Sequence, residues 1–398
     1  MNVFYIPSWY PSDENPIYGT FVKEQIEMLA LHNPAWHLGV SLWGQGRLSH
    51  MLWVGDHVKN IKKRLDWRTY QPSNQQSGNI GHFYTPCLTW TRKVSKGNLS
   101  GLLVANEKNL KSFISQVGKV DVIHAQATYP AALIAQALSE KYKIPYVVSI
   151  RMSPFPFDEF LNKKGGLKRL IAEPLLKATT LIATSHSLKA RMEIFGLSKI
   201  QVIHNPVNTE FFRPSDDEPE ELILLTIGRL EHQKGIDILI EAIALLGDRF
   251  NGKMRIGGDG SLRETYQKLA DEKGIAQKIQ WLGELSRKHV RDEMQQCSFY
   301  VLPSRHETFG NVLLEAIACG KPVVATNCGG PADIVTENSG LLCEVENAED
   351  LAEKIGQMVH SYKEYRVSNL TKHIGDNFHP DVFSGEITSL YNDLRTSQ

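Results

Sequence analysis

The chain has 398 residues, more than one hydrophobic core usually supports, so two domains are expected. Hydrophobic residues make up 42% and charged residues 22%, an ordinary globular balance that excludes a low-complexity or repeat protein. The net charge is zero, but residues 1–210 carry 24 Lys and Arg against 14 Asp and Glu, and the remainder carries 20 against 30. This asymmetry indicates either an anionic partner for the first half, such as a phosphorylated lipid or membrane surface, or two solvated domain surfaces that attract each other.

Cysteine usage and the N-terminus indicate a reducing compartment. The five cysteines form no CxxC pair, and their odd number argues against a disulfide framework. The first residues lack a basic segment followed by an apolar one, and no apolar run approaches the roughly 18 residues that a membrane span needs. We therefore expect a cytoplasmic protein, with peripheral contact to the inner face of the membrane as an option, and no nucleic-acid partner.

In the first half, short β-branched runs alternate with segments of helical spacing. Strands are expected at 2–7, 121–125, 146–150, 180–185 and 199–205, and helices at 21–32, 129–142 and 165–177. This alternation predicts βαβ units and a parallel sheet. Residues 44–100 are less regular and are expected to be a loop-rich insertion.

A second α/β unit follows an acidic, Pro-containing stretch at residues 210–221, which we interpret as a linker. We therefore divide the chain into an N-terminal domain at 1–209 and a C-terminal domain at 222–378. A final helix at 379–398 is expected to pack back on the N-terminal domain. Doubly wound domains bind ligands at the carboxyl ends of their strands, so the facing edges of the two domains are expected to form one cleft.

The first candidate motif is GRLEHQKG, Gly228 to Gly235, directly after an expected strand. Arg229 and Lys234 leave the strand end on one turn, and Gly235 opens the following helix. Two cations and helix N-terminal amides suit a diphosphate, which needs neutralisation as it becomes a leaving group. The alternative is a solvated strand–helix loop whose charges have no function.

The second motif is SRHETFGNVLLEAIACGKPVV at residues 304–324, where a loop leads from a strand into a helix. Gly310 lets a ligand approach the backbone, and the free amides of residues 310–312 suit a phosphate or hydroxyl. Glu307 precedes the helix and Glu315 lies about one turn inside it, so their carboxylates point at different parts of one ligand. The alternatives are a helix N-terminal acid for the former and a solvated helix face for the latter.

The third motif is GGDGSL, residues 257–262, at the end of an expected strand. Glycines there imply close packing against a ligand or a helix. We expect Asp259 to cap the helix that begins near Ser261.

Taken together, the motifs resemble those of the family-four-type retaining glycosyltransferases, which have the fold called GT-B, two Rossmann-like domains facing a central cleft. GRL-x4-KG, GGDG, the Glu307-x7-Glu315 pair and ACGKPVVATNCGGPADIV occur in the family's order and spacing. The resemblance covers nearly the whole chain and is most specific across residues 226–334. It implies that a nucleotide sugar is the donor and that no metal is required. The chain contains no Asp-x-Asp triplet to hold a cation between two phosphates.

The resemblance also implies a role for each candidate residue. Arg229 and Lys234 would bind the donor diphosphate, Glu315 would hold the ribose hydroxyls, and Glu307 would contact the transferred sugar. The nucleobase would lie near Leu285. The backbone amides that would help to bind sugar and phosphate are those of Phe309, Gly310, Asn311 and Val312.

The N-terminal half shows a fainter match. NPIYGTFVKEQIEML resembles the family's glycine loop, with Gly19-Thr20 in place of the usual double glycine, and the amide of Gly19 is expected to contact the donor phosphate. DVIHAQATYPAALIA resembles the segment that carries a His near the reacting sugar, which implies that His124 is catalytic. Many relatives have a second His where this chain has Gln126. The alternative for His124 is a hydrogen-bonded histidine at a strand end.

The other histidines are less promising. His204 stands where relatives place a turn at the domain crossover, so a hinge at Asn205-Pro206 is expected rather than catalysis. The remaining histidines considered lack partners at metal-ligand spacing, and no metal site is expected among them: His186, His232, His289 and His306.

The expected reaction is transfer of a hexose from a nucleotide sugar. The family resemblance favours a UDP-glucose-like donor. Arg229, Lys234 and a helix dipole would stabilise the leaving group, and retention lets a donor phosphate oxygen take the acceptor proton. The alternatives are a sugar-nucleotide epimerase of the same architecture, a non-catalytic sugar-nucleotide-binding protein and an NAD-dependent oxidoreductase. The last would need G-x-G-x-x-G after the first strand, which this chain lacks.

Acceptor recognition is expected in the N-terminal domain. Its three basic clusters, Lys59–Arg64, Arg92–Lys96 and Lys163–Arg169, favour a lipid-diphosphate-linked or membrane-bound glycan as the acceptor. The sequence therefore predicts a role in the synthesis of a cell-surface polysaccharide or glycolipid.

Overall fold

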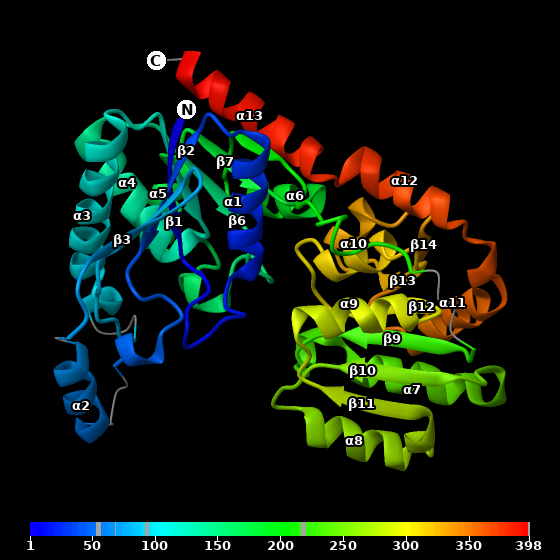
Figure 1. Ribbon diagram of the computed structural model, residues 1–398. Helices are drawn as coiled ribbons and strands as arrows, with labels where there is room; N and C mark the ends of the chain where they lie inside the picture. Colours follow the sequence, from blue (N-terminus) through cyan, green and yellow to red (C-terminus); the bar gives the residue numbers. More distant parts are fainter. Residues whose placement is uncertain (53–56, 68, 92–94, 216–219, 397–398) are drawn as a thin grey trace.

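In the computed structural model the chain forms two α/β domains, joined by a crossover near residue 205 and by a C-terminal helix that returns to the first domain (Figure 1). The structure describes residues 1–52, 57–67, 69–91, 95–215 and 220–396. Of the linker expected at 210–221, residues 216–219 therefore lie outside the described residues. Each domain is built on one mainly parallel sheet. The α/β class and the two Rossmann-like domains predicted from the sequence are confirmed.

The N-terminal sheet has the strand order β3-β4-β2-β1-β5-β6-β7-β8, and its only antiparallel pair among the described residues is β3 with β4. The elements of this domain in chain order are β1 (Asn2–Pro7), α1 (Thr20–His32), β2 (His37–Leu42), α2 (His57–Trp67), β3 (Ser73–Ser77), β4 (Ile80–Tyr84), α3 (Leu99–Val117), β5 (Val122–Gln126), α4 (Leu133–Tyr142), β6 (Tyr146–Ile150), α5 (Arg169–Leu176), β7 (Thr180–Ala183), α6 (His186–Ile194) and β8 (Ile200–Val202).

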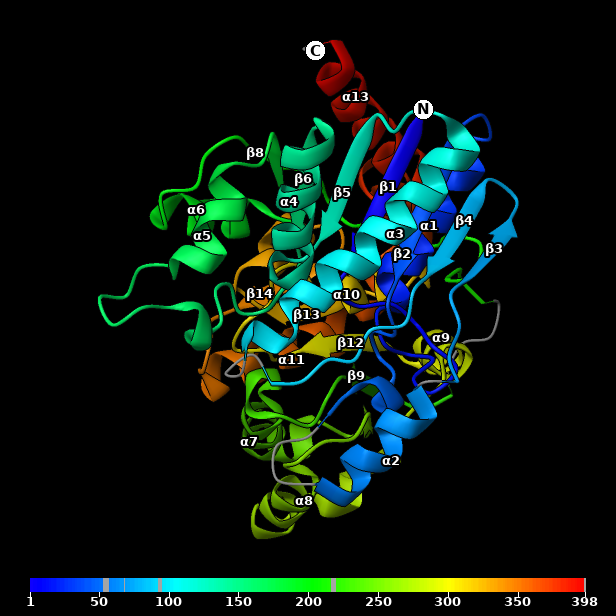
Figure 2. The ribbon, with the colours of Figure 1, turned by 90° about the vertical axis from the view of Figure 1, so that its left-hand side faces the viewer.

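The insertion at residues 44–100 is more ordered than predicted. It contains α2 and a β3–β4 hairpin, and β4 pairs in parallel with β2 so that the hairpin extends the sheet (Figure 2). All residues of β3, SNQQS, are exposed, so this edge strand carries no alternating apolar signal. The expectation of a loop-rich stretch therefore missed this hairpin.

The two faces of the N-terminal sheet bury different side chains because successive residues of a strand point to opposite sides. Phe4 and Ile6 of β1 pack with residues of α3 and α4 in one core cluster. Val3 and Tyr5 of the same strand pack on the other face, against α1 and the C-terminal helix. The sheet therefore has a buried layer on both sides, as a parallel sheet requires.

The C-terminal sheet has the order β11-β10-β9-β12-β13-β14, and all its pairs are parallel. The elements of this domain in chain order are β9 (Ile223–Ile227), α7 (Ile236–Leu246), β10 (Lys253–Gly257), α8 (Arg263–Glu272), β11 (Ile279–Gly283), α9 (Arg287–Gln296), β12 (Phe299–Leu302), α10 (Asn311–Ala318), β13 (Val323–Thr326), β14 (Gly340–Cys343), α11 (Ala348–Ser361), α12 (Val367–Asn377) and α13 (Pro380–Thr396).

Helix α13, red in Figure 1, runs from the C-terminal domain across to the N-terminal domain. Its buried apolar side chains recur at intervals of three to four residues, which places them on one face of the helix. They lie in one cluster with residues of β1 and α1, and they are Phe383, Ile387, Leu390, Tyr391 and Leu394. The first domain is thus completed by the last segment of the chain.

The loops at the carboxyl ends of the C-terminal strands contact the N-terminal domain. Gln233, in the loop after β9, donates its amide to the Ser153 hydroxyl at 2.9 Å and to the carbonyl of His306 at 2.8 Å. On the first domain, Ser185 donates to the carbonyl of Thr308 at 2.7 Å. The strand ends where α/β domains bind ligands therefore lie at the junction between the domains.

Candidate active site between the domains

Lys234 and Glu307, predicted to act on one ligand, form an ion pair. Lys234 ends a short 3-10 helix after β9 (His232–Lys234), and Glu307 lies between β12 and α10. Lys234 Nζ is 2.5 Å from Glu307 Oε1, and the side chains are 23% and 10% exposed. The Ser304 hydroxyl donates to the same carboxylate oxygen at 3.0 Å. Two loops far apart in sequence thus place one cation and one anion at one point of the junction.

Arg229 lies on the same loop as Lys234 but remains exposed. No hydrogen bond or ion pair is recorded for its guanidinium within the described part of the chain. Arg229 interacts electrostatically with Glu231, and its exposed guanidinium can offer its N–H donors to an anionic ligand.

The GGDG motif packs on this loop. A Cβ on Gly258 would lie 1.9 Å from the carbonyl oxygen of Gly228, so only glycine allows this approach. Asp259 accepts a bond from the Gly260 amide at 2.8 Å and pairs with Arg263 at 3.0 Å. Helix α8 begins at Arg263 without a side-chain cap, so the prediction that Asp259 caps it was wrong. The motif shapes the loop that carries Arg229.

Helix α10 begins where the sequence motif placed it. Gly310 precedes it with a φ of +107°, a conformation that favours glycine. Because the first N–H groups of an α-helix have no intrahelical partner, Asn311 and Val312 present amides at this end. The Phe309 ring is buried and stacks on His204 at 5.4 Å, so it supports the domain junction while its backbone leads into the helix.

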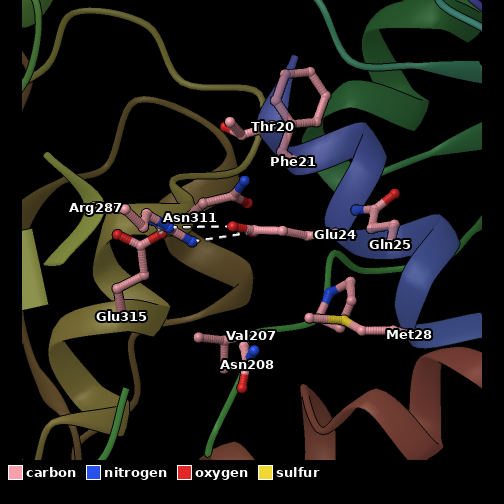
Figure 3. A pocket seen from close by; sticks show the side chains of 11 residues that line it. Thr20, Phe21, Glu24, Gln25, Met28, Val207, Asn208, Arg287, Asn311 and Glu315 are labelled. Atoms are coloured by element: carbon pink, nitrogen blue, oxygen red, sulfur yellow. Dashed lines mark hydrogen bonds and ion pairs between the residues drawn. The ribbon is translucent and has the colours of Figure 1, made fainter. Parts of the chain in front are cut away.

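Glu315 occupies a different pocket edge from Glu307 and has a partner that sequence reasoning missed. It is buried, and its Oε1 lies 2.5 Å from Arg287 Nη1 at the start of α9. Arg287 in turn binds Glu24 of α1 at 3.1 Å, which links the two domains (Figure 3). Burial raises the pKa of Glu315, and Arg287 opposes that shift.

The pocket around Glu315 is lined from both domains. Side chains of α1 form one wall and Arg287, Asn311 and Glu315 form the other (Figure 3). On the α1 wall, Gln25 is buried, and its Oε1 has no hydrogen-bond partner among the described residues. A buried acceptor without a partner costs free energy, which a donor group of a ligand would offset.

A second interdomain pocket contains Glu307. It is lined by Ser153 and Arg191 of the N-terminal domain and by Glu307, Thr308 and Cys328 of the C-terminal domain, with five further residues. Glu315 and Glu307 therefore line two different pockets of the domain junction.

Leu285 and Gly19 each lie in a closely packed loop, and neither is among the lining residues of these two pockets. Leu285 lies in the loop between β11 and α9, and its Cδ1 would be 2.7 Å from a Cβ on Gly257, so it covers the end of β10. Gly19 precedes α1 with a φ of +77°, and a Cβ there would lie 2.4 Å from the carbonyl carbon of Trp9. The loop therefore requires a glycine at position 19. This residue directly precedes α1, the helix that lines the Glu315 pocket.

His124 lies apart from these residues, inside the N-terminal domain. It is 1% exposed, its Nδ1 is 2.5 Å from the Tyr391 hydroxyl of α13, and its Nε2 is 2.7 Å from Ser149 Oγ. Both ring nitrogens are therefore engaged, as in the alternative of a hydrogen-bonded strand-end histidine. Its burial lowers the pKa to about 3, with a smaller effect of Arg151.

The His124 network reaches the junction only through other side chains. Gln126 Nε2 is 3.4 Å from His124 Nε2, and Gln126 accepts a bond from Arg151 at 2.8 Å. Arg151 donates to Asn205 Oδ1, and Asn205 donates to Asn311 Oδ1 at 2.8 Å. Asn205 of the crossover thus ties the interior of the first domain to the start of α10.

We predict that His124 makes stability depend on acid pH. Its folded pKa of about 3 lies below its ordinary value of 6.5, so the unfolded chain binds the proton first. The free energy of unfolding should therefore fall by about 1.4 kcal/mol per pH unit between pH 6.5 and 3 from this group alone. Urea unfolding of wild type, His124→Gln and the exposed control His360→Gln measures it. Equal slopes in wild type and His124→Gln would contradict the buried, neutral histidine.

A further pocket lies at the carboxyl ends of the N-terminal strands. Its lining is rich in aromatic side chains, and the one Lys or Arg among its described lining residues is Arg47, which pairs with Asp13 at 2.8 Å. The aromatic residues in the lining are Trp9, Tyr18, Trp43, Trp90, Tyr129, Phe157 and Phe160. Apolar ring faces with few charges suit an amphipathic ligand such as a sugar better than a polyanion.

None of the helices in the described ranges is both long and apolar enough to cross a bilayer. The basic cluster at Lys59–Arg64 lies on α2, where Lys59 and Lys62 are exposed. The cluster at Lys163–Arg169 lies in the exposed loop before α5 and at its first residue. In the third cluster, residues 92–94 lie outside the described residues.

The two domains match two family models. The family model described as "Glycosyltransferase Family 4" matches residues 86–211, and the model described as "Glycosyl transferases group 1" matches residues 207–372. An uncharacterized glycosyltransferase of Methanocaldococcus jannaschii is 29% identical over 81% of this chain and 87% of its own length. A Bacillus subtilis protein named for glycosyl transfer in teichuronic acid biosynthesis, TuaC, is 28% identical over 90% of both chains.

Solved structures share the fold. Sucrose-phosphate synthase from Thermosynechococcus elongatus superimposes with a TM-score of 0.74 at 18% identity, covering all of both chains. Anabaena HepE in complex with UDP has a TM-score of 0.69 at 18% identity, covering 99% of this chain and all of that one. At these identities the likeness establishes the fold and not the substrates.

The fold and the matches together define the class of this protein as a two-domain glycosyltransferase with the GT-B fold. More closely, the chain belongs to the group 1, family 4 type of glycosyltransferases, as its motifs predicted.

Three features of the junction were missed by sequence reasoning: Glu24, Arg287, and the hydrogen bonds by which Asn205 joins Arg151 to Asn311. Arg287 follows Ser286, which caps α9 by accepting a bond from the His289 amide. An arginine on the first turn of a helix, where the dipole favours anions, is a local signal that it has a carboxylate partner.

Proposed function

We propose that the protein is a retaining hexosyltransferase that needs no metal and takes its sugar from a nucleotide-sugar donor. The favoured donor is similar to UDP-glucose. The observation that carries the proposal is the Lys234–Glu307 pair beside the start of α10, at the junction of the domains. Lys234, Arg229 and the helix amides supply positive charge where a diphosphate leaves. A crystal structure of Anabaena HepE in complex with UDP and glucose supports the choice of donor.

In this proposal each site residue has a defined role. Glu315 holds the ribose hydroxyls after Arg287 yields its carboxylate, and Leu285 lies beside the nucleobase. The amide of Gly19 contacts the donor phosphate, and the amides of Phe309 to Val312 bind phosphate and sugar. His124, with both nitrogens bonded inside its domain, is assigned to positioning Gln126 and Arg151 rather than to contact with the sugar.

The chemical step follows from these roles. The bond from the anomeric carbon to the donor phosphate breaks, and the departing diphosphate takes the electron pair beside Lys234 and Arg229. The acceptor hydroxyl attacks from the same face, and its proton passes to a phosphate oxygen of the leaving group. Glu307 lies against the transferred sugar. A covalent route would instead require a carboxylate at the anomeric carbon, and Glu307 is the group placed for that.

The acceptor is proposed to be a glycan or a lipid-linked glycan, as in polysaccharide or glycolipid synthesis. The aromatic pocket of the N-terminal domain offers ring faces to sugar units. The exposed lysines of α2 are proposed to meet an anionic membrane surface from the cytoplasmic side. Binding to vesicles with anionic lipid should therefore weaken as salt increases; no binding at low salt would contradict the membrane contact.

Release of nucleoside diphosphate, measured with and without candidate acceptors, tests the proposed function. A transferase releases UDP from UDP-glucose faster when the acceptor is present. An epimerase converts the donor without acceptor and without UDP release, and a binding protein does neither. Either of these two results would contradict the proposal.

A further inference from the structure

Three potential metal ligands meet at the hinge side of the domain junction. His186 is the first residue of α6 in the N-terminal domain, and His204 lies in the crossover after β8. Asp333 ends a short 3-10 helix (Gly330–Asp333) of the C-terminal domain. The ligating atoms of these three side chains all lie within 4.8 Å of one another. No partner for His186 stands at metal-ligand spacing in the sequence, because its carboxylate partner comes from a segment 147 residues away.

The geometry of the cluster approaches that of a coordination shell. His186 Nδ1 is 2.9 Å and His204 Nε2 is 3.1 Å from Asp333 Oδ2. A tetrahedral zinc ion with bonds of about 2.0–2.1 Å separates its ligand atoms by about 3.3 Å. To admit the ion, the two His–Asp distances must open by a few tenths of an ångström, and the two imidazole nitrogens, which lie within 4.8 Å of each other, must reach the same spacing. A small movement of the exposed His186 side chain supplies this change.

The charge of the cluster favours a cation. The Asp333 side chain is 8% exposed, and no Lys or Arg ion pair is recorded for it in the described part of the chain. Its recorded partners are two imidazoles and the backbone amide of His186 at 2.8 Å. A buried carboxylate without a permanent cation is offset either by a proton on histidine or by a metal ion.

The two imidazole rings differ in how firmly neighbouring side chains fix them and in how far they are exposed to solvent. The His204 ring stacks on Phe309 at an interplanar angle of 14° and packs near Phe378, so its orientation is fixed. The His186 side chain is 73% exposed, which leaves an entry path and an open coordination position for water. A fixed ligand, a buried carboxylate and an open side are the features of a site that a metal can enter.

We propose that His186, His204 and Asp333 form a binding site for a divalent transition-metal ion of the zinc class that links the two domains at their hinge. Two nitrogen ligands and one oxygen ligand suit zinc, cobalt or nickel, whereas magnesium and calcium prefer oxygen ligands alone. The bound ion joins α6, the crossover and the C-terminal domain, so it restricts their relative motion. The cluster adjoins Phe309 through the His204 ring, but the existence of the metal site does not depend on the proposed reaction.

Metal titration of tag-free protein, stripped with EDTA and dialysed, tests the site. Calorimetry with Zn²⁺ should show one site in wild type, and Mg²⁺ should show none. His186→Ala and Asp333→Asn should each weaken Zn²⁺ binding at least about tenfold, whereas His360→Ala, an exposed histidine on α11, should bind like wild type. Co²⁺ should give a visible ligand-field spectrum that the first two variants lose.

Neither substitution is expected to unfold the protein, so a loss of Zn²⁺ binding can be assigned to the metal site. His186 is exposed, and the Asp333→Asn substitution keeps a side-chain oxygen that can accept the bond from the His186 amide. Far-UV circular dichroism and the melting temperature of the stripped variants check that they are folded. Equal Zn²⁺ affinity in wild type and His186→Ala, or no binding to wild type, would overturn the proposal and leave a hydrogen-bonded contact only.

Discussion

Replacing Glu307 with alanine is expected to lower turnover by about 10³-fold while the protein remains folded. Glu307 is 10% exposed at the interdomain pocket, held by Lys234 and Ser304 against the place proposed for the transferred sugar. Loss of one preorganised polar group at a reacting centre costs about 10²–10³ in rate, and a carboxylate in contact with the anomeric region lies at the upper end. UDP release with a working acceptor measures the effect.

Two controls make this result interpretable. Glu307→Gln keeps the shape and removes the charge, so an equal loss assigns the effect to the carboxylate. Glu353→Ala removes an acid of α11 that is 66% exposed and should leave turnover unchanged. Near wild-type turnover in Glu307→Ala would remove Glu307 from the reaction.

Lys234→Ala is expected to lower kcat/KM by about 10²–10³-fold, because it removes the cation proposed to neutralise the departing diphosphate. The change also leaves the nearly buried carboxylate of Glu307 without its partner, which should lower the free energy of unfolding by about 1–3 kcal/mol. Steady-state kinetics and urea unfolding measure the two effects. Lys268→Ala on α8, 79% exposed, is the matched control and should change neither.

The double variant Lys234→Ala/Glu307→Ala separates packing from chemistry. If the pair acts as proposed, the double variant recovers most of the stability lost in Lys234→Ala, because no unpaired carboxylate remains. It does not recover activity. A double variant as unstable as the sum of the single variants would show that the two side chains are not coupled.

The fold was predictable from the sequence because its signals were local. Runs such as ELILLTIG and NVLLEAIACG carry the strand and helix patterns of β9 and α10 within about ten residues. The β3–β4 hairpin escaped because the polar edge strand β3 buries no side chain. Where hydrophobic residues show no periodicity, the sequence does not indicate a helix or a strand.

Candidate residues could be named where a motif marks their segment, and not where no motif does. Lys234 and Glu307 were both named, and the structure brings them together. Arg287 and Glu24 are 263 residues apart, and only the folded chain pairs them. His124 matched a family segment, yet its environment is set by Tyr391 of the last helix, which no local pattern connects to β5.

The metal cluster escaped sequence reasoning for the same reason. His186 and Asp333 are 147 residues apart, and the crossover brings His204 beside them. Metal-ligand spacing in sequence detects sites built on one hairpin or helix, and it does not detect ligands from three segments.

The central claim is that a nucleotide sugar binds between the domains with its ribose on Glu315 and its diphosphate on Lys234. A thermal-shift screen of UDP-, GDP- and ADP-sugars on wild type and Glu315→Ala tests it most directly, because a ligand that binds only the native state raises the melting temperature. We expect UDP-glucose at about 100 times its Kd to raise the Tm of wild type by about 3 °C and to leave Glu315→Ala unshifted. No shift with any of these sugars, or an equal shift in both proteins, would contradict the account.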